Sequence, residues 1–90
     1  MSSSSAQGVG SYAHRIVTDH WRDTLQLDGD YEDYTFYELG GTSLTAAQLV
    51  LALGRELGCR ISVQAVADNP TLRQFRAHVL TIAAEAGRDM

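Results

Sequence analysis

The chain has no lysine, a single cysteine, a single proline and no long run of apolar residues. No segment approaches the roughly 18 consecutive apolar residues that a helix needs to cross a bilayer. The stretch MSSSSAQGVGS at the N-terminus has neither the basic nor the apolar segment of a secretory signal. These absences argue against membrane insertion and secretion, so we expect a soluble, cytoplasmic protein.

The shortage of cysteine and the charge balance narrow the possible partners. Cys59 has no second cysteine with which to form an internal disulfide or a metal site. The net charge is −4, from seven arginines and eleven acidic residues, and such a balance repels nucleic acid. Seven of the eleven acidic residues lie between Asp19 and Glu38, which gives this part of the chain a negative face. We therefore expect no nucleic-acid partner.

The length of 90 residues allows one domain, because so short a chain cannot bury two separate cores. Residues 1–11 are rich in serine and glycine, which predicts a flexible N-terminal tail. Residues 87–90 predict a second, shorter tail. The domain is therefore expected to span residues 12–86.

Apolar residues at steps of three and four predict two long helices in the first two thirds of the chain. The first runs from about Tyr12 to Leu25, and its apolar stripe consists of Ala13, Ile16, Val17, Trp21 and Leu25. The second begins at Thr42 or Ser43 and ends just before Gly58, which supplies a C-terminal stop.

The last third of the chain predicts a third long helix. Thr71 is placed to cap it, and Gln74 closes a capping box three residues later. Its apolar stripe consists of Leu72, Phe75, Val79, Ile82, Ala83 and Ala86. The segment SVQAVAD before it alternates as a strand would, but no second strand is predicted to pair with it. We therefore expect a short helix there and an all-α fold of three long helices and one short one.

A polar and aromatic loop of about fifteen residues, DGDYEDYTFYELGG, joins the first two helices, and a loop of that length is often functional. Phe36 and Leu39 are expected in the core, and three tyrosines are expected to cover its edge: Tyr31, Tyr34 and Tyr37. Four acidic residues suggest a calcium loop: Asp28, Asp30, Glu32 and Asp33. The glycine and the closing glutamate of that motif are out of register, so we expect no metal.

Ser43 follows two glycines and precedes a helix with no charged residue before Arg55. A catalytic serine needs a base, and the sequence offers neither a G-x-S-x-G elbow nor an S-x-x-K motif around it. Ser43 or Thr42 could simply cap the helix. However, Gly40 and Gly41 leave the approach to the hydroxyl bare. A helix N-terminus also suits a phosphate, because free N–H groups and the helix dipole stabilise it.

The stretch FYELGGTSL resembles the phosphopantetheine attachment motif of carrier proteins, in the double-glycine form typical of peptidyl carrier proteins of nonribosomal peptide synthesis. The early tryptophan helix, the long loop, ELGCRISV and NPTL follow in the order seen in that family, from about Arg15 to Leu80. The resemblance implies an acyl carrier protein-like, right-handed helical bundle. It also implies a peptidyl carrier protein that is not itself an enzyme.

In that family a phosphopantetheinyl transferase moves 4'-phosphopantetheine from coenzyme A onto the serine. The resemblance therefore implies covalent attachment at Ser43, with Gly40, Gly41 and Thr42 forming the rest of the site. An adenylating enzyme would load the arm, and condensation or tailoring enzymes would receive the cargo. Many acyl carriers have aspartate where this chain has Thr42, so which transferase acts here stays open.

Four residues are implied as the face that meets partner enzymes: Leu44, Ala47, Val63 and Ala67. A core position is the alternative for each of them. The helix after Ser43 cannot bury all its apolar residues, so part of it should form an exposed apolar strip.

Two alternatives to a peptidyl carrier remain. One is an acyl carrier of a polyketide or fatty-acid pathway, although the segment from Gly40 to Gly54 lacks the acidic residues of fatty-acid carriers. The other is an unmodified helical adaptor that uses the uncharged helix only for docking. We expect a monomer. The initiating methionine and short tails suggest a free-standing carrier, although a domain excised from a larger synthetase would look the same. The cargo and the final product are not encoded here.

Overall fold

In the computed structural model, residues 2–29 and 31–88 are described, and for residues 2–11 and 87–88 only the backbone is. Within these ranges the chain forms four helices and no strand: α1 (Ser2–Leu25), α2 (Ser43–Leu57), α3 (Gln64–Asp68) and α4 (Leu72–Arg88). The predicted all-α class, with three long helices and one short one, is therefore confirmed.

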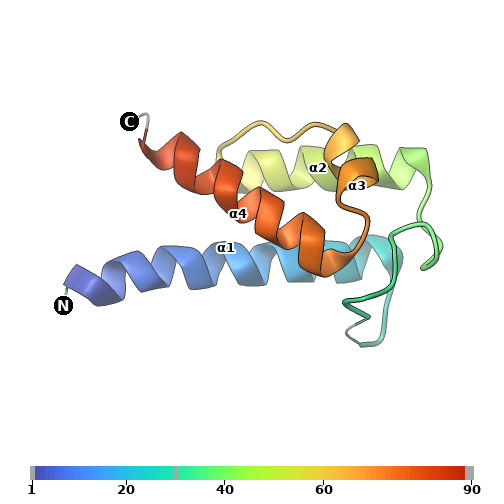
Figure 1. Ribbon diagram of the computed structural model, residues 1–90, viewed down its shortest axis with the longest axis horizontal. Coiled ribbons are helices and arrows are strands. Elements are labelled where there is room, and N and C mark those ends of the chain that lie inside the picture. The colour runs from blue at the N-terminus through green and yellow to red at the C-terminus, as the bar shows by residue number, and fades with distance from the viewer. Residues whose placement is uncertain (1, 30, 89–90) are drawn as a thin grey trace.

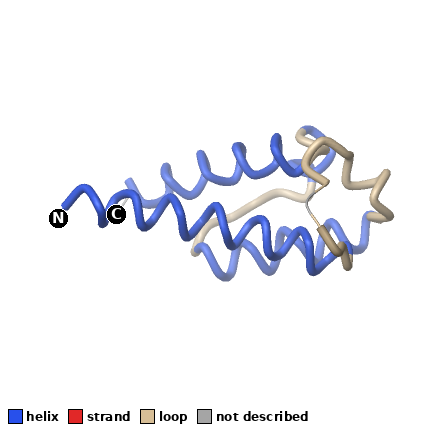
Figure 2. The backbone as a smooth tube through the Cα atoms, turned by 90° about the horizontal axis from the view of Figure 1, so that it is seen from below, coloured by secondary structure: helices blue, strands red, loops and turns tan. Residues whose placement is uncertain are grey.

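The three long helices pack so that Ser43 lies at the end of the bundle opposite to the chain termini. α1 and α2 run antiparallel, and α4 crosses them obliquely (Figure 1). The loop between α1 and α2 lies at the end away from both termini in two perpendicular views (Figures 1 and 2). α2 begins at the end of this loop. The loop and the start of α2 therefore share one end of the molecule.

The core is built around three aromatic rings that come from three different parts of the chain. The ring of Trp21 lies 5.2 Å from that of Phe36 and 5.5 Å from that of Phe75. All three side chains are almost fully buried. Because each such burial stabilises the fold by about 1.5–3 kcal/mol, Phe36 makes the loop a structural part of the bundle.

Caps confirm the predicted end of α2 and the predicted start of α4. Gly58 ends α2 in the left-handed conformation, with φ of 68°, and its N–H donates to the carbonyl of Gly54. Before α4, the N–H of Gln74 donates to Thr71 Oγ1 at 3.2 Å, and the N–H of Thr71 donates to Gln74 Oε1 at 3.2 Å. The predicted capping box is therefore present.

α1 begins at Ser2 instead of at about Tyr12. The apolar stripe marks only the part of a helix that packs against its neighbours, and Ala13 is the first buried residue among those whose side chains are described. The stripe therefore could not locate the true start of the helix. Met1 and residues 89–90 lie outside the described residues, and so does Asp30 of the acidic loop. The flexibility of residues 1–11 and 87–90 stays a prediction.

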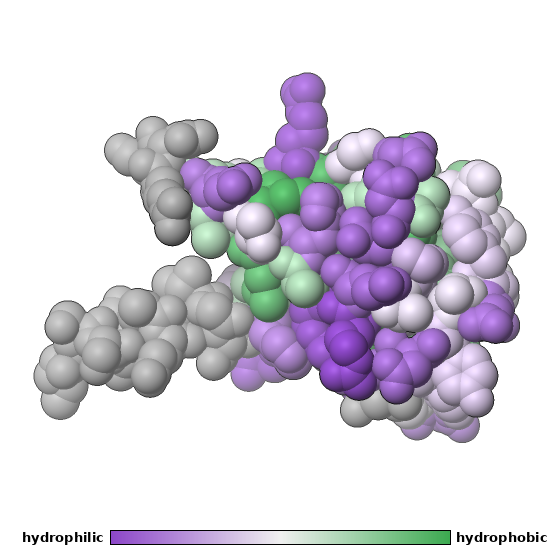
Figure 3. All heavy atoms as spheres, in the orientation of Figure 1, coloured by the Kyte–Doolittle hydropathy of each residue, from purple (hydrophilic) through white to green (hydrophobic). Residues whose placement is uncertain are grey.

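Of the three loop tyrosines expected at the edge of the core, Tyr37 packs edge-on against buried Phe36, with ring centroids 5.5 Å apart. Tyr31, Tyr34 and Tyr37 are 37%, 55% and 48% exposed. Phe36 is fully buried as expected, whereas Leu39, also expected in the core, is only partly buried. In the view of Figure 1, hydrophilic residues cover most of the face that the coloured residues form (Figure 3). Among the described residues, no helix is both long and apolar enough to span a membrane.

Candidate functional site

A compact turn leads from the core into the start of α2. The N–H of Gly40 donates to the carbonyl of Tyr37 at 3.1 Å, and the N–H of Gly41 donates to that of Phe36 at 2.9 Å. Because Phe36 is fully buried, the turn is anchored in the core only two residues before Ser43.

The two glycines of the turn are required for different physical reasons. Gly40 has φ of 97°, a conformation that side chains disfavour, and a Cβ there would meet no atom within 4 Å. A Cβ on Gly41 would collide with the ring of Phe36 and lie 2.8 Å from its carbonyl oxygen. The positive φ therefore accounts for Gly40, whereas the packing of Phe36 requires Gly41. That both glycines also clear the approach to Ser43 stays a prediction.

Thr42, and not Ser43, caps α2. The N–H of Thr45 donates to Thr42 Oγ1 at 3.2 Å, and the N–H of Thr42 donates to Thr45 Oγ1 at 2.8 Å. The carbonyl of Thr42 accepts the first helical hydrogen bond, from Ala46 at 2.9 Å. Sequence reasoning left the cap open between Thr42 and Ser43. The structure has Thr42 as the cap, and Ser43 is the first residue of the helix.

The Ser43 side chain is exposed, and its hydroxyl forms no hydrogen bond with any residue that the structure describes. The N–H groups at the start of a helix have no acceptor within the helix, and the helix dipole adds positive potential there. No acidic residue lies in the first turn of α2. A phosphodiester on Ser43 would therefore meet open space and no repelling carboxylate, so the residues present fit a phosphopantetheine group.

None of the three histidines hydrogen-bonds Ser43 in the described part of the chain. His20 Nε2 lies 2.7 Å from Glu56 Oε1, near the opposite end of α2. This hydrogen bond is the main cause that lowers the pKa of Glu56. His14 and His78 are exposed. The base that a nucleophilic serine would need is not supplied by these contacts.

The four residues implied as a partner face are all exposed. Leu44 and Val63 are 68% and 48% exposed, and Ala47 and Ala67 also lie at the surface. The core alternative is therefore wrong for each of them. α2 buries its other side instead, through Ala46, Leu49, Val50 and Leu53.

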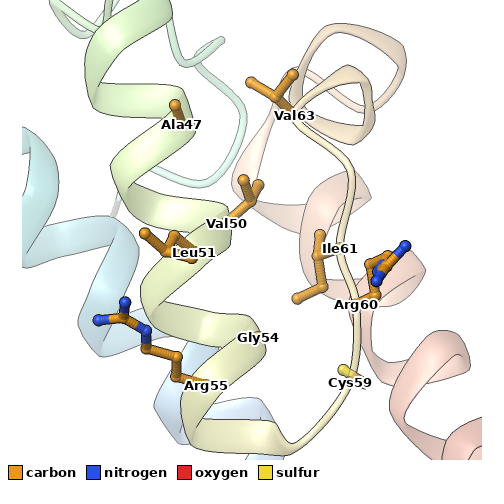
Figure 4. A pocket seen from close by; sticks show the side chains of 9 residues that line it. All are labelled: Ala47, Val50, Leu51, Gly54, Arg55, Cys59, Arg60, Ile61 and Val63. Atoms are coloured by element: carbon orange, nitrogen blue, oxygen red, sulfur yellow. The ribbon is translucent and has the colours of Figure 1, made fainter.

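A groove of about 540 Å³ runs between α2 and the segment that follows it. It is lined by Ala47, Val50, Leu51, Gly54, Arg55, Cys59, Arg60, Ile61 and Val63. Val50 and Ile61 point toward one another across it, while Arg55 points away (Figure 4). The groove thus brings together Ala47 and Val63, two of the four implied partner residues.

Sequence reasoning missed Leu51 in this surface, although the side chain is 56% exposed and lines the groove. Its position four residues after Ala47 places it on the same helix face, which is the signal that could have found it. Burial raises the pKa of the Cys59 thiol in the groove. At the loop, a hydrogen bond to Asp28 raises the pKa of Tyr31.

Comparison with known proteins agrees with this geometry. The family model described as "Phosphopantetheine attachment site" matches residues 15–79. The chain is 30% identical over 70 residues to surfactin synthase subunit 2 of Bacillus subtilis (strain 168), covering 78% of this chain and 2% of that protein. It is 38% identical over 62 residues to the nonribosomal peptide synthetase sirP of Leptosphaeria maculans, covering 68% of this chain and 3% of that protein. The chain thus spans a few per cent of the length of these relatives.

A solved structure shares the fold. BlmI, a type-II acyl-carrier-protein from Streptomyces verticillus involved in bleomycin biosynthesis, superposes with a TM-score of 0.70 at 20% sequence identity. The match covers 83% of this chain and 90% of BlmI. At this level of identity the similarity establishes the helical arrangement alone.

Proposed function

This chain belongs to the phosphopantetheine attachment family, and on that premise we propose that it is a peptidyl carrier protein whose arm is attached at Ser43. One observation supports Ser43 as the attachment residue. The Ser43 hydroxyl is exposed and unbonded among the described residues, because Thr42 provides the cap of α2. A serine needed only for capping would have its hydroxyl engaged with the backbone.

The residues around Ser43 account for what the chain itself contributes. Thr42 fixes the helix start, Gly41 lets the turn pack on Phe36, and Gly40 leaves the space beside the turn open. A phosphopantetheinyl transferase can therefore approach the hydroxyl, which acts as the acceptor. When bound, 4'-phosphopantetheine supplies a long arm with a terminal thiol that holds an acyl or aminoacyl group as a thioester. In this proposal the chain is acted upon and catalyses no step.

The charge of α2 favours a peptidyl over an acyl carrier. A carrier that binds basic partners presents acidic residues on this helix, whereas α2 has none before Glu56. Two relatives, one named as a nonribosomal peptide synthetase and one as surfactin synthase subunit 2, support the same assignment. An acyl carrier of a polyketide or fatty-acid pathway remains the nearest alternative.

We further propose that Leu44, Ala47, Val63 and Ala67 contact the partner enzymes, with Leu51 added by the structure. The partner enzymes are the phosphopantetheinyl transferase, an adenylating enzyme, and condensation or tailoring enzymes. Exposed apolar side chains beside an apolar groove are typical of a protein contact. We also propose that the protein works as a monomer in the cytoplasm, either free-standing or as part of a larger synthetase.

The direct test is the intact mass of the protein after incubation with coenzyme A, magnesium and a broad-specificity phosphopantetheinyl transferase. We expect the wild type to gain one phosphopantetheinyl group and Ser43→Ala to gain none. Ser62→Ala is a control, because it removes the hydroxyl of another exposed serine, which accepts from the N–H of Gln64, and it should be modified like the wild type.

Two results would contradict the proposal. If folded wild type gains no mass, the unmodified docking adaptor becomes the better explanation of the exposed apolar surface. If Ser43→Ala is still modified, the arm is attached elsewhere.

A further inference from the structure

Arg76 of α4 is a charged residue that is only 8% exposed, and it lies outside the site described above. Its Nη2 donates to Glu32 Oε1 at 2.6 Å, and its Nη1 donates to Thr18 Oγ1 at 3.0 Å. One guanidinium therefore joins α4, α1 and the loop between α1 and α2. Burial of a guanidinium is costly and is tolerated only with good partners, and these two contacts supply them.

The same loop residues meet α4 through Arg73. The backbone N–H of Arg73 donates to the carbonyl of Glu32 at 3.4 Å, and its Nε donates to Asp33 Oδ1 at 3.2 Å. Arg73 is exposed, and an exposed ion pair adds little stability. The buried contact of Arg76 is therefore the principal charged link between this part of the loop and α4.

The link continues along the backbone to the attachment site. Thr35 and Thr71 form an antiparallel bridge. The N–H of Phe36 donates to the carbonyl of Pro70 at 2.7 Å, and the carbonyl of Phe36 accepts from the N–H of Gly41 at 2.9 Å. Gly41 stands two residues before Ser43. The turn that presents Ser43 is thus attached to the start of α4.

We propose that Arg76 is a positioning residue for the modification of Ser43, an inference that rests on the proposed function. By holding the Glu32 carboxylate against α4, Arg76 keeps the loop, and through Phe36 the turn before Ser43, in one conformation. Without it, the Glu32 carboxylate keeps, among the described residues, only Arg73 Nη2 at 3.9 Å, and the loop occupies more conformations. The fraction of molecules that present Ser43 correctly then falls.

This mechanism makes a specific kinetic prediction. When only a fraction of the molecules is competent to bind, the apparent affinity falls by that fraction. Once the complex with the transferase has formed, it is the same as in the wild type, so its rate of reaction is unchanged. In the transferase assay, Arg76→Met should therefore raise KM for this protein about fivefold while kcat stays within about twofold. Val79→Ala is the matched control, because it removes buried packing from α4 without touching the ion pair, and it should leave KM unchanged.

Two further variants separate the contacts of Arg76. Thr18→Val removes the acceptor on α1 and keeps Glu32, so we expect wild-type KM. Arg76→Lys keeps a cation for Glu32 but cannot fork to both partners, so its KM should lie between those of wild type and Arg76→Met. If Thr18→Val raises KM as much as Arg76→Met, or if Val79→Ala does, the positioning role through the loop is wrong.

Amide hydrogen exchange tests the same inference without the transferase. In Arg76→Met, the N–H groups of Phe36 and Gly41 should exchange at least about tenfold faster, because local opening of the turn exposes them. The N–H of Ala46, bonded to Thr42 inside α2, should keep its wild-type rate. Glu32→Gln should also speed the exchange of the N–H groups of Phe36 and Gly41. This variant provides the test if Arg76→Met folds poorly. Unchanged exchange at both amides would overturn the inference, whether or not the wild type is modified.

Discussion

The segment that leads into Ser43 and the surface that follows it are held in different ways. Before Ser43, Phe36 is fully buried, Gly41 is bonded to it, and Thr42 is tied into a capping box. After Ser43, Leu44 is 68% exposed and Leu51 is 56% exposed. One region fixes the position of the hydroxyl, and the other leaves apolar area in solvent. A preorganised site loses less entropy on binding, so the two regions serve the same partner in complementary ways.

This difference predicts how substitutions in the two regions should behave. Changes before Ser43 alter contacts that stabilise the fold, so they should lower the free energy of unfolding. Changes to the exposed side chains after Ser43 alter groups that the fold does not bury, so they should affect mainly the transfer reactions. The predictions below run from the largest expected change in stability to the smallest.

Gly41→Ala should destabilise the protein most. The new Cβ would collide with the Phe36 ring, which packs edge-on against Trp21. Overpacking of a core position costs about 1–3 kcal/mol and occasionally more, and we expect the upper part of this range. Urea unfolding followed by Trp21 fluorescence measures the loss.

Gly40→Ala is the control for this prediction. It introduces the same methyl group into open space, so it tests only the positive φ of 97°, and that strain costs about 1–2 kcal/mol. A loss for Gly40→Ala equal to or larger than that for Gly41→Ala would contradict the packing explanation of Gly41.

Thr42→Ala should have an intermediate effect. It removes the hydroxyl that accepts from the N–H of Thr45, and loss of such a cap costs about 1 kcal/mol. Thr42→Ser keeps the hydroxyl and should retain wild-type stability. Because Thr42 and not Ser43 caps the helix, Ser43→Ala should cost less than Thr42→Ala in the same urea titration. The reverse order would return the capping role to Ser43.

The sequence predicted the helices well because the signals involved are local. The Thr71 and Gln74 pair, Gly58 and the apolar stripes depend on neighbours within one or two turns, and each is found in the structure. The attachment motif was equally local. By contrast, the link from Arg76 to Glu32 joins residues 44 positions apart, and no periodicity or motif connects them.

Two expectations were limited by the same lack of tertiary information. Gly41 lacks a side chain because a Cβ would meet the Phe36 ring, a contact that a sequence motif cannot distinguish from a need for open access. The division of α2 into a buried and an exposed face also required the position of its neighbours. Apolar residues occur on both faces, and only packing shows that Leu49 is buried while Leu51 is exposed.

Ala47→Glu should have the smallest effect on stability and a clear effect on function. The side chain is exposed, and substitutions at such positions usually change stability by less than about 0.5 kcal/mol. However, Ala47 lines the groove beside Val50 and Val63, where a bound partner would desolvate the new carboxylate. A penalty of about 1.4 kcal/mol corresponds to a tenfold loss. We expect a tenfold lower kcat/KM for loading by an adenylating enzyme that loads the wild type.

Gln48→Glu provides the charge control for this comparison. It places the same carboxylate one residue further along α2, at an exposed position outside the groove lining. The net charge and the charge of the helix change equally in the two variants, so long-range steering changes alike. Only contact at the groove distinguishes them, and Gln48→Glu should be loaded within about twofold of the wild type. Equal losses in both variants would mean that charge alone sets the rate and that the groove is not the contact surface.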